Sequence, residues 1–228
     1  WVQQAEGYFR PAHNPYTDQG YYFLSDSDPE PRLVPAKAGS PAEAEGAADM
    51  FYSRLYHEVD EVSPGDAGFL LLGEDFKYTP SRTFNFNMPD LVESEPVKME
   101  VSFVAYTVTL GSSLSFTVDG KTLPATVSDN ISHLIDTKYG YGEECLTRKE
   151  FQVKGNAMSL GISYKARGTV KLANLNYIAV NYPRKLRLPS DKRLVFYMDS
   201  DKRRVRLSGA SKSTRVWDVT DPQKITLM

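Results

Sequence analysis

Few side chains in this sequence could act as a nucleophile. The only thiol is Cys145, and the three histidines are His13, His57 and His133. Two glutamates precede Cys145 directly; carboxylates oppose thiolate formation, whereas a nucleophilic cysteine needs positive surroundings. His133 lies twelve residues earlier, but no spacing rule makes it the base of a dyad. We therefore predict that Cys145 is structural and that this chain carries no catalytic residue.

Candidate metal ligands are equally sparse. The residues after His57 resemble the start of a zinc-protease motif, but the second histidine is absent, and a zinc site needs three or four ligands. Two Asp-x-Asp pairs, Asp26/Asp28 and Asp199/Asp201, could join a calcium shell, although neither lies in a twelve-residue calcium loop. Asp side chains more often form turns. We expect no zinc and no cofactor, with a bound calcium as the open alternative.

Other chemical motifs are missing from the sequence. It contains neither a Gly-rich phosphate loop nor a Gly-x-Ser-x-Gly elbow. Aromatic side chains could instead make a platform that stacks on sugar rings, with Tyr139 and Tyr141 as the candidate binding residues. Aromatic residues at strand spacing more often belong to a core, so sugar binding stands as the less favoured interpretation.

The composition favours a β-protein. Of 228 residues, 41% are hydrophobic and 25% are charged, with 14 Tyr and 11 Phe. Aromatic and β-branched residues suit a pleated, half-buried surface. No run approaches the 18 apolar residues of a membrane-spanning helix. With one cysteine, an internal disulfide is excluded.

The charge is unevenly distributed along the chain. The net charge is −2, but the segment from Arg184 to Arg215 holds 11 Lys and Arg against 3 Asp and Glu. Such a basic strip can mark an interface. Its basic residues alternate with apolar ones, so we interpret them instead as the solvent face of strands. We predict no nucleic-acid partner.

Hydrophobic residues recur with a period of two along almost the whole chain. This period, interrupted by frequent turn signals, indicates an all-β fold. We predict a β-sandwich, jelly-roll-like, with a few short helices or loops near the N-terminus. The predicted strands are 21–24, 50–57, 69–72, 83–88, 101–110, 113–118, 121–127, 151–153, 158–164, 169–181, 193–198, 205–207, 214–218 and 224–227.

One turn has a particularly clear signal. Asp119-Gly120 separates two alternating runs, and this dipeptide is typical of a type I′ hairpin turn, which requires positive φ at two residues. Pro124 in the second run cannot donate to a ladder, so that strand should lie at a sheet edge.

Two segments of different character divide the chain. Residues 1–49 should hold an N-terminal strand and a mobile loop rich in Pro, Ala and Glu, with a weak helical period at 41–49. Residues 50–228 should form one β-sandwich domain. The sequence starts at Trp1 without a signal peptide and stops at Met228 after a strand-like run, so we expect a piece of a longer polypeptide.

Several local motifs share an order along the chain. Asn14-Pro15-Tyr16 precedes Gly20-Tyr21-Tyr22-Phe23-Leu24, and a later block contains His57, Glu58, Gly73, Glu74 and Phe76. Tyr177 follows in Leu175-Asn176-Tyr177-Ile178, and Trp217-Asp218-Val219-Thr220-Asp221-Pro222 comes last. Together these motifs resemble the non-catalytic N-terminal region of gingipain-like cysteine peptidases, and especially the PorU-type sortases of the type IX secretion system.

That resemblance implies a function for the parent protein. Proteins of this family are cell-surface cysteine peptidases that remove the C-terminal signal of secreted cargo, and their catalytic Cys and His lie in a domain after the Trp-Asp-Val-Thr strand. It implies a location at the outer-membrane surface or outside the cell, a non-catalytic role for this segment, and contacts with its own downstream peptidase domain, cargo or secretion proteins. The matched residues, including Trp217 and Tyr177 as core-sized aromatics and Asp218 as a turn cap, are predicted to be structural.

A binding module is the alternative hypothesis. In that case the β-sandwich would belong to a secreted protein and would present coplanar tyrosines to a carbohydrate.

Overall fold

The computed structural model describes residues 1–11, 19, 34–36, 46–64, 71–107, 109–124, 143–191, 193–198, 204–221 and 223–228. These residues form two compact units. The first unit comprises Trp1–Pro15 and Met50–Lys185, and the second comprises Tyr16–Asp49 and Leu186–Met228. The expected division was instead at residue 49, with 50–228 in one domain.

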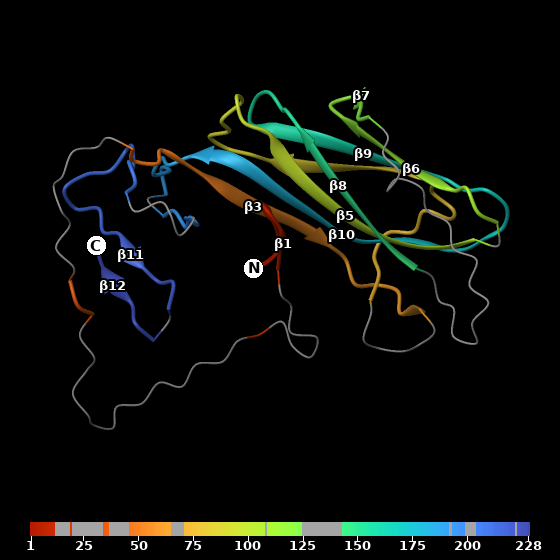
Figure 1. The fold of residues 1–228 in the computed structure, drawn as a ribbon, viewed down its shortest axis with the longest axis horizontal. Helices are drawn as coiled ribbons and strands as arrows, with labels where there is room; N and C mark the ends of the chain where they lie inside the picture. The colour runs from red at the N-terminus through yellow and green to blue at the C-terminus, as the bar shows by residue number, and fades with distance from the viewer. Residues whose placement is uncertain are drawn as a thin grey trace, which may run out of the picture. The chain divides into compact units, whose positions relative to one another are not determined.

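The first unit is a sandwich of two four-stranded antiparallel sheets (Figure 1). One sheet has the strand order β3-β10-β5-β8, and the other has the order β4-β9-β6-β7. The strands are β3 (Met50–Glu58), β4 (Ser81–Asn87), β5 (Val97–Thr107), β6 (Ser113–Val118), β7 (Lys121–Thr122), β8 (Glu143–Phe151), β9 (Ala157–Lys165) and β10 (Val170–Lys185).

The chain alternates between the two sheets, and only β6 and β7 are consecutive strands of the same sheet. This strand order is that of a jelly roll. The prediction of an all-β, jelly-roll-like sandwich is confirmed. Among the described residues, no helix is long and apolar enough to cross a membrane.

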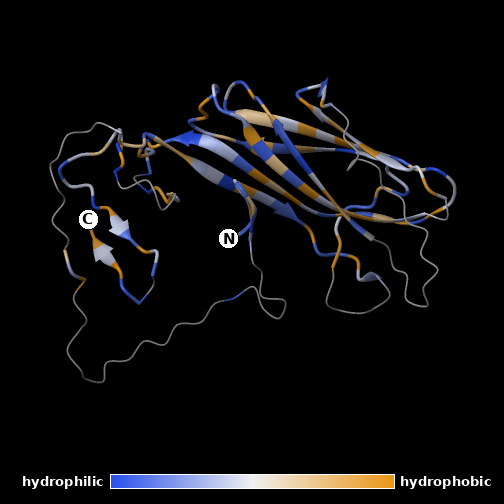
Figure 2. Cartoon of the chain, in the orientation of Figure 1, coloured by the Kyte–Doolittle hydropathy of each residue, from blue (hydrophilic) through white to orange (hydrophobic). Residues whose placement is uncertain are grey.

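The core lies between the two sheets. Alternate residues of each strand enter it, which gives the banded colouring of the strands in Figure 2. In β5, for example, Val97, Met99, Val101 and Phe103 are fully buried and belong to this core. Burial of such apolar surface is the main stabilising term of the fold.

A β-bulge in β10 changes which residues face this core. Leu175 pairs with Phe103 and Tyr177 pairs with Ser102, so Asn176 is an extra residue in β10. Before the bulge, Leu175 faces the core, whereas after it the core residues are Ile178 and Val180. The extra residue therefore moves the inward positions from odd to even numbers, and it places Tyr177 on the outer face.

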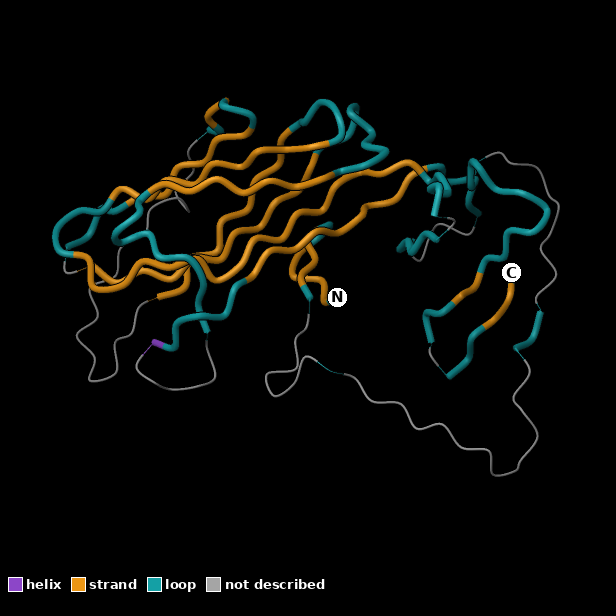
Figure 3. The backbone as a smooth tube through the Cα atoms, turned by 180° about the vertical axis from the view of Figure 1, so that it is seen from behind, coloured by secondary structure: helices purple, strands orange, loops and turns teal. Residues whose placement is uncertain are grey.

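Two small hairpins accompany the sandwich. In the first unit, β1 (Val2–Ala5) pairs with β2 (Tyr8–Arg10) at the N-terminus, where Figure 3 shows it from behind. In the second unit, β11 (Trp217–Asp218) pairs with β12 (Thr226–Leu227). Strands β1 and β2 are not predicted from the sequence, because each is shorter than the run in which a period of two can be recognised.

The turn prediction is confirmed. Val118 pairs with Lys121, and the two residues between them, Asp119 and Gly120, have φ values of 49° and 79°. Both are positive, as a type I′ turn requires. Strand β7 lies at a sheet edge and ends at Thr122, before Pro124.

Some strand predictions are wrong. The run 193–198 forms no strand, and in 205–207 only Val205 makes an isolated bridge, with Ala48. The described residues 193–198 and 204–207 of the basic strip are therefore not the solvent face of a regular sheet. Of the predicted strand 151–153, only Phe151 is in a strand, as the last residue of β8, whose alternation is hidden because the inward residues Thr147 and Lys149 are polar. The predicted strand 21–24 and residues 41–45 of the weak helical period at 41–49 lie outside the described residues, and residues 46–49 form no helix.

The Asp119-Gly120 turn gives a test of the local fold. Gly120→Ala should destabilise the protein by about 1 kcal/mol, because an L-residue is strained at positive φ. No atom lies within 4 Å of the added Cβ, so the loss comes from the backbone alone. Urea unfolding measures it, with Gly120→Asn as the control that should lose less. An alanine variant as stable as the wild type contradicts the assigned turn.

Candidate functional site

Six of the residues singled out from the sequence meet around β10. His57 and Glu58 end β3, and Glu58 is the register partner of Tyr177. The backbone N–H of Gly73 donates a hydrogen bond to the carbonyl oxygen of Leu175, and the backbone carbonyl of Glu74 accepts a hydrogen bond from the Leu175 N–H. These bonds lengthen the sheet beyond the end of β3, since the segment 73–76 continues the pairing along β10.

The types of Gly73 and Phe76 follow from this arrangement. A Cβ on Gly73 would lie 2.7 Å from the Val59 carbonyl oxygen, so only glycine fits. Phe76 is 1% exposed and packs edge-on against Phe103, with ring centroids 5.1 Å apart. Both residues are thus explained by packing.

His57 and Glu74 form a pair at the open side of the sandwich. His57 Nε2 lies 2.6 Å from Glu74 Oε1. The imidazole also packs against the Phe84 ring of the other sheet, with centroids 4.9 Å apart. Glu74 Oε2 is shielded from solvent and has no hydrogen-bond partner. The pair therefore links the end of β3 in one sheet to Phe84 of β4 in the other.

A shallow depression of about 730 Å³ lies beside this pair. Most of its lining comes from β4 and the residues just before it: Thr79, Ser81, Arg82, Thr83, Phe84, Asn85 and Phe86, with Tyr56, His57 and Glu74 opposite. The lining offers hydroxyl, amide and guanidinium groups. Within the described part of the chain, no cluster of three His, Cys, Asp or Glu residues could hold a metal ion.

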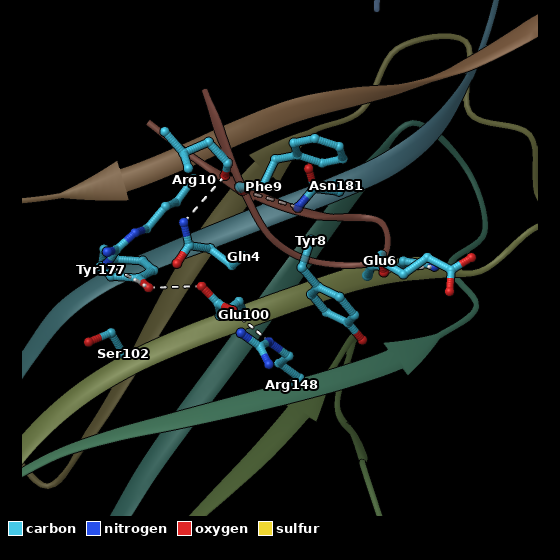
Figure 4. A network of polar contacts seen from close by, with 12 residues as sticks. Gln4, Glu6, Tyr8, Phe9, Arg10, Glu100, Ser102, Arg148, Tyr177 and Asn181 are labelled. Carbon is cyan, nitrogen blue, oxygen red and sulfur yellow. Dashed lines mark hydrogen bonds and ion pairs between the residues drawn. The ribbon is translucent and has the colours of Figure 1, made fainter. Parts of the chain in front are cut away.

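A second polar cluster lies on the outer face of the β3-β10-β5-β8 sheet, beneath the β1–β2 hairpin (Figure 4). At its centre is Glu100, whose side chain is 2% exposed. The Tyr177 hydroxyl donates to Glu100 Oε1 at 2.8 Å, and Arg148 Nε donates to Oε2 at 2.6 Å. Arg10 from the hairpin donates to the Tyr177 hydroxyl at 3.3 Å. A buried carboxylate is tolerated only with such partners.

Cations and rings fasten the hairpin to this face. The Arg54 guanidinium lies 3.7 Å from the centroid of Phe9 and 5.6 Å from that of Trp1. Arg148 lies 5.4 Å from the Tyr8 centroid. Each such contact contributes about 0.5–1 kcal/mol where it is exposed to water. The hairpin is therefore attached by polar and aromatic contacts.

The remaining predicted residues lie apart from both clusters. Asp218 Oδ1 accepts hydrogen bonds from the backbone N–H and hydroxyl of Thr220, at 3.0 and 2.7 Å, as expected of a turn cap. Trp217 is 45% exposed, so its expected place in a core is wrong for the described structure. Tyr139, Tyr141, His133 and both Asp-x-Asp pairs lie outside the described residues. Cys145 is half-buried and packs against the core.

The cluster around Glu100 has no clear signal in the sequence. Lys98, Glu100 and Ser102 alternate with apolar residues in β5, and such polar positions are ordinarily solvated. Here Glu100 and Ser102 are buried among partners from β8 and β10, and a hairpin from nearly one hundred residues away covers the same face. Tyr177 was singled out, but its contact with a carboxylate carried no sequence signal.

The fold and these clusters define a jelly-roll β-sandwich module with an N-terminal hairpin on one face and a second small unit. No family model matches the sequence, and no curated protein matches it. Among solved structures, the chain is similar to dimeric latent PorU from Porphyromonas gingivalis, with a TM-score of 0.69 and 20% identity over 86% of this chain. At this identity the likeness shows a shared fold. The chain spans 19% of that PorU chain.

Two other solved structures are more distant. A family 35 carbohydrate binding module from Clostridium thermocellum has a TM-score of 0.34 and 10% identity, covering 58% of this chain and 98% of the module. The insecticidal delta-endotoxin Cry8Ea1 from Bacillus thuringiensis has a TM-score of 0.31 and 14% identity, covering 45% of this chain and 18% of the toxin. No functional inference rests on either.

The buried carboxylate gives a stability prediction. Glu100→Ala should destabilise the protein by about 3 kcal/mol, because it removes one partner of a buried charged pair. The Arg148 side chain is 37% exposed and can be solvated once Glu100 is removed, which keeps the loss of stability from being larger. Glu100→Gln keeps an acceptor for Tyr177 and should lose less. Urea unfolding of both variants decides, and equal losses would contradict the pairing.

Unfolding at alkaline pH tests the contacts between the β1–β2 hairpin and the sheet. Burial, with Glu150 nearby, raises the pKa of the Tyr8 phenol from 10.0 to about 12, and burial with the Glu100 hydrogen bond also raises the pKa of Tyr177. The unfolded chain loses these protons first, so stability is full below pH 10 and decreases as pH rises towards 12. Tyr8→Phe should make this decrease less steep in urea unfolding at pH 10 to 12. An unchanged slope would refute the assignment to Tyr8.

Proposed function

We propose that this chain is a non-catalytic accessory β-domain of a cell-surface cysteine peptidase of the gingipain-like family, resembling the type IX secretion sortases. The observation that carries the proposal is the likeness to PorU over 86% of the chain. The ordered motifs of the sequence support the same family. The proposed location is the outer-membrane surface or the extracellular space.

The proposed role is to orient a peptidase domain or to contact cargo or secretion machinery. The chemistry of the described residues supports a non-catalytic role. Cys145 lies on β8 and packs against the core, and the His57–Glu74 pair borders a shallow open depression. Glycine and aromatic positions of the family motifs, such as Gly73 and Phe76, serve packing in this fold.

The second unit offers the surface for docking. Among its described residues only Leu186 is a buried hydrophobic residue, whereas many large apolar side chains are exposed. They are Val34, Val195, Tyr197, Val205, Trp217, Val219 and Met228. Exposed apolar surface of this kind marks interaction sites. We propose that the peptidase domain of the same polypeptide covers Trp217 and Val219.

Two measurements on the encoded polypeptide test the proposal. The coding region on both sides of residues 1–228 should encode a gingipain-like domain with a catalytic Cys and His, and unrelated neighbouring domains would overturn the family assignment. In that whole polypeptide, Trp217→Ser combined with Val219→Ser should speed hydrogen exchange in the peptidase domain and lower its activity several-fold, because an apolar contact is lost. Tyr78→Ser, at a residue of the first unit that is 79% exposed, is the control and should change neither.

A further inference from the structure

Among the described strands, β4 lies at the edge of its sheet and has a strand on one side only. It pairs with β9 along its whole length, Ser81–Asn87, without a register shift. Met88 donates its N–H to the Asn156 carbonyl, and Tyr164 donates to the Pro80 carbonyl. In an antiparallel ladder such hydrogen-bonded pairs alternate along the strands. The even-numbered residues of β4 therefore bond to β9.

The odd-numbered residues direct their backbone groups outward. The N–H and C=O of Thr83 and Asn85 thus point away from β9, at the open side of the sheet. Within the described residues no backbone partner occupies this side of β4. Thr83 and Asn85 are exposed, and both line the depression beside His57 and Glu74.

This edge lacks the features that normally prevent strand addition. Sheet edges are protected by charges, proline, bulges or short length. The edge strand β7 has two residues, and β8 carries glutamates together with Arg148 and Lys149. Strand β4 has seven residues, no proline and no bulge, and Arg82 is its only charged residue.

Arg82 gives the edge a positive charge. Its Nε donates to the Asp75 carbonyl oxygen at 3.0 Å, and its guanidinium lies 5.8 Å from the Phe76 centroid. Neither contact neutralises the charge, and in the described chain Arg82 forms no ion pair. The lining also holds Glu74, which is bonded to His57. Arg82 thus brings to the depression a positive charge that pairs with no carboxylate among the described residues.

We propose that the free edge of β4 binds an extended peptide segment that carries an acidic side chain. The segment adds as a strand beside Ser81–Asn87 and bonds to the outward backbone groups of Thr83 and Asn85, while its carboxylate meets Arg82. Strand addition of this type obtains affinity from the backbone and specificity from alternate side chains. Arginine binds carboxylates through two parallel hydrogen bonds.

A second copy of β4 fits this edge less well. The sequence Ser81–Asn87 contains no Asp or Glu, so pairing of two β4 strands would leave both Arg82 charges without a carboxylate. The inference rests on the first unit alone and does not require the proposed docking of Trp217. If no peptide binds at β4, the proposed accessory role is unaffected. If the accessory role is refuted, the proposal of a peptide site at β4 is unaffected.

The test uses residues 1–228 within the encoded polypeptide and three labelled probes. These are short peptides of alternating Thr and Val whose central residue is Glu, Gln or Lys, and fluorescence anisotropy measures their binding. The Glu peptide should bind about tenfold more tightly than the Lys peptide, and high salt should reduce the difference. Arg82→Gln should abolish the preference for Glu, whereas the control Lys165→Gln, at the exposed end of β9, should preserve it.

Asn85→Pro tests the backbone part of the site. It removes an outward N–H and no bond to β9, so binding of all three peptides should weaken about tenfold. If this variant fails to fold, hydrogen exchange of the wild type replaces it, and the Thr83 and Asn85 amides should become protected when the Glu peptide is added. Unchanged amide exchange, equal binding of the Glu and Lys peptides, or no binding overturns the proposal. So does a concentration-dependent dimer that the Glu peptide cannot dissociate, since the edge then belongs to a second copy.

Discussion

The structure depends on the burial of β10 on both of its faces. This strand of sixteen residues pairs with β3 on one side and β5 on the other, and the segment 73–76 continues that pairing. Its inner face supplies Leu175 and Ile178 to the core. Its outer face carries Tyr177 and Asn181, which the N-terminal hairpin covers. The bulge at Asn176 makes both roles compatible, because it sets the face on which each later residue lies.

The polar contacts between the hairpin and the sheet face determine where the hairpin can bind. An apolar lid would be held by burial alone, and it could slide or be replaced by another apolar surface. Here Glu100 needs the particular donors that Tyr177 and Arg148 provide, and Arg10 adds a bond from the hairpin itself. Desolvation of a carboxylate is unfavourable without those partners. The cluster around Glu100 therefore favours one position of the hairpin. It contributes less to the free energy of folding than an equal area of apolar core.

The two proposed contacts of the molecule use opposite kinds of surface. In the second unit, exposed apolar side chains such as Trp217 favour a lasting contact with another domain. At β4 the outward backbone groups, which have no partner among the described residues, and the charge of Arg82 suit a segment that binds in an extended form and can dissociate again. The His57–Glu74 pair lies beside β4 and adds polar groups to the depression there. A module that orients a peptidase domain and also binds an extended peptide transiently would need both kinds of surface.

Much of this fold was determined by the sequence alone. Alternation of apolar residues predicted the sandwich, and Asp119-Gly120 fixed a turn, because both signals are local and depend on backbone geometry. Tertiary structure decided the rest. The two short N-terminal strands acquire order only by packing on a face built from residues far along the chain, and that packing turns Glu100 from a solvated residue into a buried one. His57 and Glu74 were both singled out, but only pairing along β10 brought them within 2.6 Å, since neither residue's neighbours in sequence specify its neighbours in space.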